Sequence, residues 1–467
     1  MNLTRDSGLS TVQSSELTPG FSAQEYETRR RNLMNSLPDS SIVVAISGAM
    51  KYMSGQIFYK FRQASDFWYL TGFEEPNSAV ILEKTSTSRG YRMTLFCTGR
   101  DSAKEKWDGA KTSLNEAGTI FQADDARSID HFSSHLRSVL SIYSSVFVDL
   151  PPTHTRKSSK FTAKSILQYL SPPLTPRSEY DPIVEAVSSS RRKPLAPKVA
   201  QLRAFKSESE LRVMRQAADI SGRAHAKTMR FARPGLSESA LAAHFEYLCS
   251  LAGSQRPAYV PVVASGANAL IIHYTSNNHL IRENELLLID AGCEYNGYAS
   301  DITRSFPASG TFTPPQRDLY SAVLTVQKAL IALCTESAGL SIHQIHRETC
   351  VLLRQELKQT GLDVTANDLE QLLFPHYVSH PIGLDLHESS NFDRSGSLKA
   401  GMVITIEPGI YVPPSPLFPK HFHNIGIRIE DEVVIGKEHP VVLSVGAPKE
   451  IADVEGACQG LLGLEPF

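Results

Sequence analysis

A chain of 467 residues is long enough for two or three domains, and its hydrophobic content of 41% is sufficient for a substantial core. Its 47 Lys and Arg residues against 49 Asp and Glu residues give a net charge of −2. That balance excludes the strongly basic surface typical of proteins that bind nucleic acid or membrane surfaces. No apolar run approaches the roughly 18 to 20 residues that a membrane span requires. We therefore expect a soluble globular protein with no nucleic acid partner and no membrane span.

The 6 cysteines are scattered along the chain and form no CxxC pair. Most stand in apolar segments, where a free thiol behaves as a small hydrophobic group, and this predicts a reducing, intracellular compartment. Residues 1–17 are rich in Ser and Thr but lack the apolar core of a secretory signal, and their acidic residues make them a poor transit peptide. We interpret them as a disordered N-terminal tail.

Residues 18–181 are predicted to form a mixed α/β domain. Polar helical stretches, such as the one at 23–37, alternate with apolar strand candidates. These candidates are residues 41–47, 78–83, 93–97 and 145–150. Residues 182–206 contain serines, adjacent basic residues and prolines, a composition typical of an exposed connection, and are predicted to be a linker.

The second predicted domain spans residues 207–450, followed by a C-terminal tail at 451–467. Ser207 stands three positions before Glu210, a spacing that predicts a capped start for a long amphipathic helix. A helix leading into 235–237, GLS, is echoed by a helix leading into 339–341, again GLS, and another helix follows each. The pattern indicates a duplicated unit, in which acidic residues from each half can meet near a pseudo-symmetry axis.

Five residues in this domain are candidate metal ligands. The apolar run 286–290 ends in Asp290, and Asp301 follows eleven residues later. His380 stands in HYVSHPIGLDLHES, while VITIEPG and IGIRIEDEVV supply Glu407 and Glu430. Taken singly, each is more often a turn or core residue than a ligand. Together, four carboxylates and one imidazole suit a pair of Mn, Co or Zn ions better than a thiolate-type zinc site.

The order of these motifs resembles the pita-bread metallopeptidases, in the aminopeptidase P and prolidase branch. The motifs are DAG-x4-GY-x2-DITR, HYVSHPIGLDLH, EPGIY and GIRIED, and the similarity covers residues 207–445. FRQASDFWYLTGFEEP at 61–76 is similar to the N-terminal domain of aminopeptidase P. ELTPG and FPKHFHNIGIRIED resemble the eukaryotic organellar members, aminopeptidase P type 3 and the mitochondrial intermediate cleaving peptidase. The resemblance implies an α/β (α+β) fold, in which the mixed α/β domain precedes a pita-bread catalytic domain with pseudo-two-fold duplicated halves.

The resemblance also implies roles for individual residues. Asp301 and Glu430 would bridge two divalent ions, and Glu407 would both bind an ion and guide the proton of the attacking water. Two such ions lower the pKa of a water between them and polarise the bond that it attacks. Mn²⁺ is the first choice of ion, with Co²⁺ or Zn²⁺ as alternatives. The other implied catalytic or substrate-binding residues are His273, His376, His387, Tyr259, Arg428, Tyr411 and Trp107.

One position departs from the family pattern, because Pro381 follows the ligand histidine. Proline favours extended geometry in the residue before it, which a ligand on a strand tolerates, so we expect a shifted pocket wall and an intact metal site. Trp107 matches a tryptophan that reaches a neighbouring subunit's active site in oligomeric relatives. A homo-oligomer, dimer or tetramer, is therefore expected.

The predicted function is that of a dinuclear metal-dependent aminopeptidase that hydrolyses the N-terminal peptide bond of peptides or proteins and prefers Xaa-Pro N-termini. One alternative is a mitochondrial intermediate-cleaving exopeptidase, which removes a single bulky N-terminal residue from processed precursors. An alternative of another class is a metal-free pita-bread binding module. The resemblance favours a mitochondrial location, whereas the poor transit peptide favours the cytoplasm.

Overall fold

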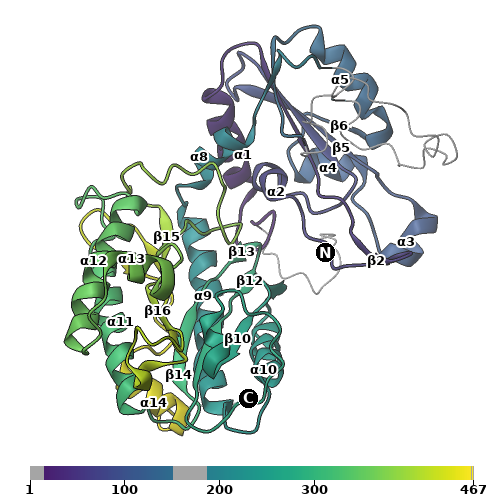
Figure 1. Cartoon of the computed structure of the whole chain (residues 1–467). Coiled ribbons are helices and arrows are strands. Elements are labelled where there is room, and N and C mark those ends of the chain that lie inside the picture. The colour runs from purple at the N-terminus through teal and green to yellow at the C-terminus, as the bar shows by residue number, and fades with distance from the viewer. Residues whose placement is uncertain (1–14, 151–182, 184–186, 464, 466–467) are drawn as a thin grey trace, which may run out of the picture. The chain divides into compact units, whose positions relative to one another are not determined.

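A computed structural model of the chain describes residues 15–150, 183, 187–463 and 465. The chain divides into two compact units, Met1–Leu202 and Arg203–Phe467. Most of the predicted N-terminal tail, residues 1–14, lies outside the described residues. Among the helices in the described ranges, none is long and apolar enough to cross a membrane. Figure 1 colours the first unit purple to blue and the second teal to yellow.

The first unit is built on a six-stranded mixed sheet with the order β6-β5-β4-β1-β7-β8. Its central strand β1 pairs antiparallel with β4 and parallel with β7, and all six residues of β1 are buried. The strands are β1 (Ser41–Ile46), β2 (Tyr52–Ser54), β3 (Ile57–Phe58), β4 (Ala79–Lys84), β5 (Tyr91–Cys97), β6 (Asp125–Ser128), β7 (Ser145–Phe147) and β8 (Arg192–Lys193). The four predicted strands are thus confirmed as β1, β4, β5 and β7.

Helices flank this sheet, and the predicted helix at 23–37 is confirmed as α1. The helices are α1 (Ala23–Asn35), α2 (Ser65–Thr71), α3 (Ser102–Asp108), α4 (Leu114–Ile120), the short η1 (Ile129–His131), α5 (Phe132–Leu140) and α8 (Ala196–Arg203). β8 and α8 lie where an exposed linker was predicted. β8 instead extends the sheet beside β7, and Val199 and Ala200 of α8 are buried, because apolar residues are interspersed among the basic ones.

The second unit surrounds several short sheets with long helices. Its helices are α9 (Glu208–Phe231), α10 (Glu238–Leu251), η3 (Gly266–Leu270), α11 (Pro314–Ala332), α12 (Ile342–Gln359), α13 (Ala366–Asp368), η4 (Leu369–Leu373), η5 (Lys420–Phe422) and α14 (Ile451–Gln459). Its strands are β9 (Arg256–Pro257), β10 (Val262–Ser265), β11 (Leu286–Asp290), β12 (Cys293–Tyr295), β13 (Tyr298–Ala299), β14 (Thr303–Pro307), β15 (Val403–Ile406), β16 (Gly409–Val412), β17 (Ile425–Arg428), β18 (Asp431–Val434) and β19 (Val441–Val442).

The predicted repeat is visible in the helix pairs of this unit. Gly235 and Gly339 both adopt left-handed backbone conformations, with φ of +88° and +66°, and each ends the turn after a long helix. Ser237 and Ser341 then cap the next helix, each accepting a backbone N–H three residues on. The predicted capping box of α9 is also present, with Ser207 and Glu210 bonding to each other's backbone N–H. Two α–turn–α segments therefore precede the two groups of strands that carry the candidate ligands.

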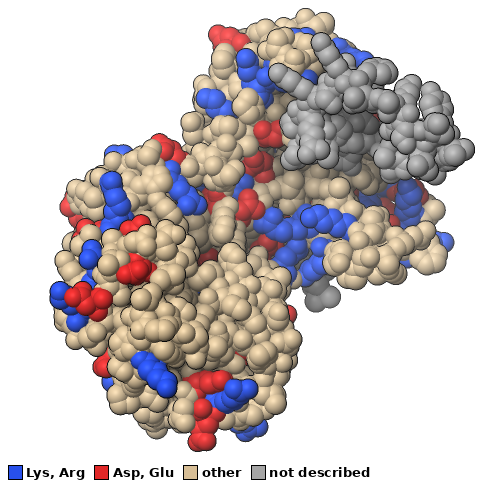
Figure 2. Space-filling view, viewed as in Figure 1, with Lys and Arg blue, Asp and Glu red and all other residues tan. Residues whose placement is uncertain are grey.

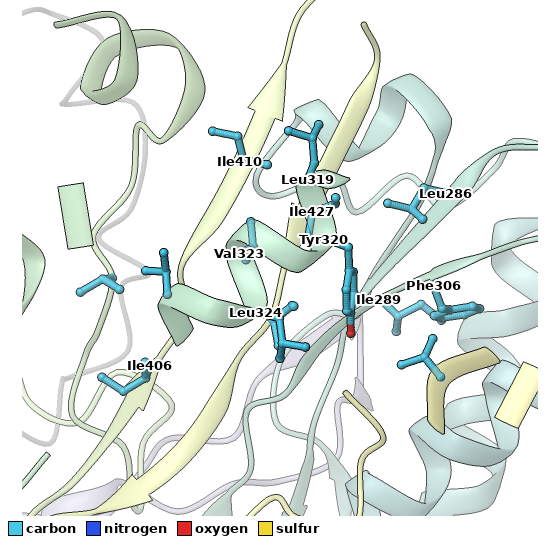
Figure 3. Close-up of a cluster of buried hydrophobic side chains, with 14 of the residues drawn as sticks. Leu286, Ile289, Phe306, Leu319, Tyr320, Val323, Leu324, Ile406, Ile410 and Ile427 are labelled. Atoms are coloured by element: carbon cyan, nitrogen blue, oxygen red, sulfur yellow. The ribbon is translucent and has the colours of Figure 1, made fainter. Parts of the chain in front are cut away.

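One hydrophobic core joins the two halves of the second unit. Figure 3 shows a cluster formed by Leu286, Ile289 and Phe306 from the first half and by Leu319, Tyr320, Val323 and Leu324 of α11, with the ring of Tyr320 beside Ile289. The labelled residues from that half are Ile406, Ile410 and Ile427. Because α11 contacts β15, β16 and β17, it holds strands from distant parts of the sequence in one packed layer.

The C-terminal segment differs from the tail predicted at 451–467. Residues 451–459 form α14, which packs against α9, and Val454 and Ala457 are fully buried. The physical reason is that these apolar residues lie on one face of the helix and close the core beside β14.

On the side of the second unit visible in Figure 2, acidic and basic side chains form small separate groups, in keeping with the balanced charge.

Candidate metal centre

Asp290 and Asp301 are brought together by a tight turn in the chain. Asp290 is the last residue of β11, where it pairs with Thr303 of β14, and Asp301 stands just before that strand. Gly292 makes the turn possible, because a Cβ there would lie 1.8 Å from the carbonyl oxygen of Ser300. The hydroxyl of Tyr259 lies 2.5 Å from Asp290 Oδ1 and 2.7 Å from Asp301 Oδ1. The two carboxylates therefore face one point.

Glu407 and Glu430 stand at matching breaks in the second group of strands. Ile406 pairs with Asp431 at the end of the β15/β18 ladder, and Gly409 pairs with Arg428 at the start of the β16/β17 ladder. Glu407 lies between β15 and β16, and Glu430 lies between β17 and β18. Pro408, which has no N–H, cannot continue the ladder. Residues 425–434 thus form two strands, β17 and β18, and the break between them places Glu430.

His380 is oriented so that one ring nitrogen faces the carboxylates. Its Nδ1 donates to the carbonyl oxygen of Pro381 at 3.1 Å, which leaves Nε2 free to act as a ligand. Nε2 lies 3.1 Å from Asp301 Oδ2 and 3.8 Å from Glu407 Oε1. Pro381 also forms a β-bridge with Ile404. The unusual proline therefore supplies the carbonyl group that orients the imidazole.

The five predicted ligands converge on one buried site. Ligand atoms of Asp301, His380 and Glu430 all lie within 4.8 Å of one another, and all three residues are buried. Asp290 lies beside these three residues because the Tyr259 hydroxyl contacts both Asp290 and Asp301. Glu407 lies beside them because its Oε1 is 3.8 Å from His380 Nε2.

Burial and mutual repulsion disturb the ionisation of these groups. Burial, together with the negative charges of Asp301 and Asp290, raises the pKa of Glu407 to about 7, although His380 and Arg428 oppose the shift. Burial and Asp301 also raise the pKa of Glu430 well above its usual range. For Asp301, burial acts in the same direction, but the hydrogen bond and charge of His380 prevail and lower its pKa. The positive charges near the site do not balance its carboxylates, and bound cations would provide the missing positive charge.

Arg428 begins a chain of hydrogen bonds along the edge of the site. Its guanidinium donates to Asp290 Oδ2 at 2.5 Å, to Tyr411 Oη at 2.7 Å and to Thr303 Oγ1 at 3.1 Å. Tyr411 Oη in turn lies 2.9 Å from His376 Nε2. Because His376 Nδ1 donates to the carbonyl of Tyr377, Nε2 must accept the proton of Tyr411. Burial, followed by the charge of Arg428, lowers the pKa of His376 to about 3, so this imidazole is neutral.

The remaining predicted residues occupy different surroundings. His387 is exposed, and its ring centroid lies 4.3 Å from that of His380. His273 is also exposed, and it follows η3, which packs against β16 and β17. His387 therefore lies against the ligand histidine, and the loop with His273 lies beside the strands of Tyr411 and Arg428. Trp107 belongs to α3 of the first unit, where its side chain is 88% exposed, so it does not pack locally.

Several residues that support the ligands were missed in the sequence. Thr405 Oγ1 accepts the N–H of His380 at 3.1 Å and lies 3.4 Å from Glu407, while Thr303 donates to Glu430 at 2.6 Å. Glu432 accepts the N–H of Asp301 at 2.9 Å. Thr405 shares a strand face with Glu407, a signal that was available from alternation alone. The contact of Glu432 with Asp301 joins positions far apart in sequence and had no local signal.

The residues present fit divalent ions. Carboxylate oxygens and one imidazole nitrogen are the donors that such ions take, and the elevated pKa values of Glu407 and Glu430 mark carboxylates held together without enough positive charge. Asp290, Asp301, His380, Glu407 and Glu430 would hold them.

Comparison with known families places this site in context. Residues 212–437 match the family model described as metallopeptidase family M24, and residues 26–147 match the aminopeptidase P N-terminal domain. Intermediate cleaving peptidase 55 of Saccharomyces cerevisiae is 38% identical over 96% of this chain and 86% of its own length. The chain belongs to metallopeptidase family M24. Its place in the aminopeptidase P branch follows from the N-terminal domain and from these relatives, and it is a peptidase.

Other relatives of this M24 metallopeptidase agree. Xaa-Pro aminopeptidase 3 of Homo sapiens is 34% identical, with 95% of this chain and 87% of the relative covered. The crystal structure of Icp55 from Saccharomyces cerevisiae matches with a TM-score of 0.83 and 37% identity over 96% of this chain and 100% of that chain. Aminopeptidase P from E. coli with the inhibitor Pro-Leu matches with a TM-score of 0.83 and 30% identity over 95% and 100%. The predicted fold, a mixed α/β domain followed by a pita-bread domain, is confirmed.

The ionisation of Glu407 predicts a pH effect on the stability of the ion-free enzyme. With a folded pKa of about 7 against about 4.5 when unfolded, the folded protein binds a proton that the unfolded chain has lost between these pH values. Stability from this group therefore falls as pH rises through that window, by up to about 3 kcal/mol. Glu407→Gln removes the effect. In chelator, the thermal midpoint of Glu407→Gln should rise relative to wild type from pH 5 to pH 8; parallel curves would contradict the assignment.

Proposed function

We propose that this M24 metallopeptidase is a dinuclear aminopeptidase that removes the N-terminal residue of peptides and prefers proline in the second position. The observation that carries the proposal is the convergence of four carboxylates and the Nε2 atom of His380 in one buried site. A metal-free binding module would not require four carboxylates and an imidazole nitrogen gathered in one buried site. The E. coli aminopeptidase P structure, whose title names the inhibitor Pro-Leu, supports a pocket for proline in the same fold.

Each residue of the site has a proposed task. The five proposed ligands would hold two divalent ions, which would supply the charge that activates the attacking water and polarises the scissile bond. Glu407 would bind an ion and take the proton of the attacking water as a general base. The exposed His273 and His387 would hydrogen-bond the reacting amide and the leaving amine.

The pocket for the second residue would be formed by His376, Tyr411, Arg428 and Tyr259. The neutral His376, fixed by Tyr411, would accept a hydrogen bond or pack against the proline ring without adding charge. Arg428 holds Asp290 in place, so its loss would disturb both the pocket and the ligand. We propose Mn²⁺ as the native ion because an oxygen-rich site with a single imidazole is of the kind that it occupies, with Co²⁺ and Zn²⁺ as alternatives.

The ligand assignment predicts the effect of a single isosteric change. Asp301→Asn keeps the shape of the side chain but removes a negative charge from the proposed bridge, so bound metal and turnover should fall by several orders of magnitude while the thermal midpoint without metal is retained. Turnover after dialysis against chelator, and its recovery with Mn²⁺ or Co²⁺, would be measured together with metal content. Asp453→Asn, on α14, is a matched control that should change neither quantity. A folded and fully active Asp301→Asn enzyme would refute the assignment.

A second function is favoured by the similarity to intermediate cleaving peptidase 55, which extends over 96% of this chain. In that case the enzyme removes one bulky N-terminal residue from processed precursors with little regard for proline. The catalytic group is the same in both functions, and only the pocket for the second residue differs.

A comparison of three peptides distinguishes these functions. For an Xaa-Pro aminopeptidase, catalytic efficiency should be highest on Leu-Pro-Pro, lower on Leu-Ser-Pro, and lowest on the dipeptide Leu-Pro. Products would be quantified by mass spectrometry with one residue expected per cleavage. Preference for Leu-Ser-Pro would favour the processing function, whereas preference for Leu-Pro would make the enzyme a prolidase.

We further propose a homo-oligomer, in which Trp107 inserts against a second copy of the chain. The supporting observation is the 88% exposure of this indole, an unusual state for a large aromatic group. Sedimentation should give a dimer or tetramer for wild type, and Trp107→Ala should weaken association and lower activity together. Lys104→Ala, on the same helix with its side chain 75% exposed, is the control. A fully active monomeric wild-type enzyme would exclude this arrangement.

A mitochondrial location is proposed from the relatives, one of which, in Arabidopsis thaliana, is named as mitochondrial. Fractionation of cells that express the full chain tests the location, and recovery only in the cytosol would contradict it.

A further inference from the structure

A loop between β10 and β11 carries His273, a residue of the proposed catalytic group. The loop begins with η3, passes through the exposed His273 and returns past His279 toward α10. η3 packs against β16 and β17, the strands that carry Tyr411 and Arg428, so the loop lies beside the site. Five hydrogen bonds from Ser265 and this loop converge on one carboxylate elsewhere in the chain.

That carboxylate is Glu238, the first residue of α10, which is fully buried. Its Oε1 accepts the N–H and the hydroxyl of Ser265, both at 2.8 Å, and the side-chain amide of Asn268 at 2.9 Å. Its Oε2 accepts the hydroxyl of Tyr274 and the N–H of His279, both at 2.9 Å. One side chain thus binds the loop at its start, beside His273 and at its end.

These contacts do not serve the helix on which Glu238 stands. The cap of α10 is Ser237, whose side chain accepts the N–H of Ala240. All the donors to the Glu238 carboxylate belong to residues 265–279. The backbone adds to the attachment, since Glu238 donates its own N–H to His279 O and Ser237 forms a β-bridge with Leu280. An acidic residue in a first helical turn commonly stabilises the helix, but here the carboxylate is committed to the loop.

The loop also supports the rest of the site. Ala269 and Tyr274 belong to one buried cluster with Tyr411, which contacts His376 and Arg428. β17 approaches so closely that a Cβ at Gly426 would lie 2.4 Å from the carbonyl oxygen of Ala269. These apolar contacts do not involve Glu238, so loss of its carboxylate would shift mainly the exposed segment that carries His273. Misplacement of a reacting group by about 1 Å can cost about 10²-fold in rate.

We propose that Glu238 is a positioning residue of this enzyme, which holds the 266–279 loop so that His273 stands beside the reacting groups. The donors are neutral N–H and O–H groups, so the ionised carboxylate satisfies all of them. Glutamine at this position would present an amide group to at least two donors and release part of the loop. The inference rests on the proposed function, because only there does His273 contact the substrate.

Kinetics of the intact metal-loaded enzyme test this role. Glu238→Gln should lower kcat by about 10- to 10²-fold with KM and metal content little changed, and hydrogen exchange in residues 266–279 should become faster. Glu246→Gln, farther along the same helix, is the control and should behave as wild type. In a His273→Ala background, Glu238→Gln should lower kcat by less than about twofold, because the side chain that it positions is already absent.

Two results would overturn the inference while leaving the proposed function intact. The first is an equal loss of kcat from Glu238→Gln with and without His273, and the second is unchanged kcat or unchanged exchange in the loop. By contrast, full activity of His273→Ala would refute the proposed role of His273 itself. If Glu238→Gln does not fold, Tyr274→Phe removes one donor at 2.9 Å and should give a smaller loss of kcat that likewise disappears in the His273→Ala background.

Discussion

Repulsion among buried carboxylates is the constraint on which the structure of the second unit depends. Asp301 and Glu430 offer ligand atoms within 4.8 Å of one another and of His380, at positions largely removed from water. Charged groups of one sign are costly at such depth unless a partner of opposite sign is present. Arg428 and His380 supply part of that charge, and Tyr259 donates a hydrogen bond. Negative charge therefore remains without a partner, as expected of a site for divalent ions.

The fold supplies the rigidity that this repulsion requires. One pair of the proposed ligands lies at a turn that only glycine permits at position 292, and another pair lies where two hairpin ladders break. α11 packs the strands from both halves into a single core, so neither pair can move apart without opening apolar contacts (Figure 3). A surrounding set of hydrogen bonds fixes the orientation of the proposed ligands. It includes those of Thr303, of Thr405 and of the chain from Arg428 through Tyr411 to His376. This division between ligands and supporting residues is common to metal sites in proteins.

Much of this arrangement could be predicted from sequence because its signals are local. Apolar strands, the capping box at Ser207 and the repeated turns at 235–237 and 339–341 were all confirmed. The predicted ligands also converge, although their identification needed their joint order along the chain. What could not be predicted arises from contacts between distant segments. Glu238, an ordinary first-turn residue by sequence, binds a loop that extends to residue 279, and α14 forms a helix because the core beside α9 accepts it.

X-ray diffraction with anomalous scattering at the manganese edge tests most directly whether the buried carboxylates and His380 hold two ions. Crystals of the active Mn²⁺-loaded enzyme should show two anomalous peaks, both within bonding distance of Asp301 and Glu430, with His380 Nε2 beside one of them. Crystals of fully active enzyme with no peak among these residues, or with manganese bound only elsewhere, would contradict the account.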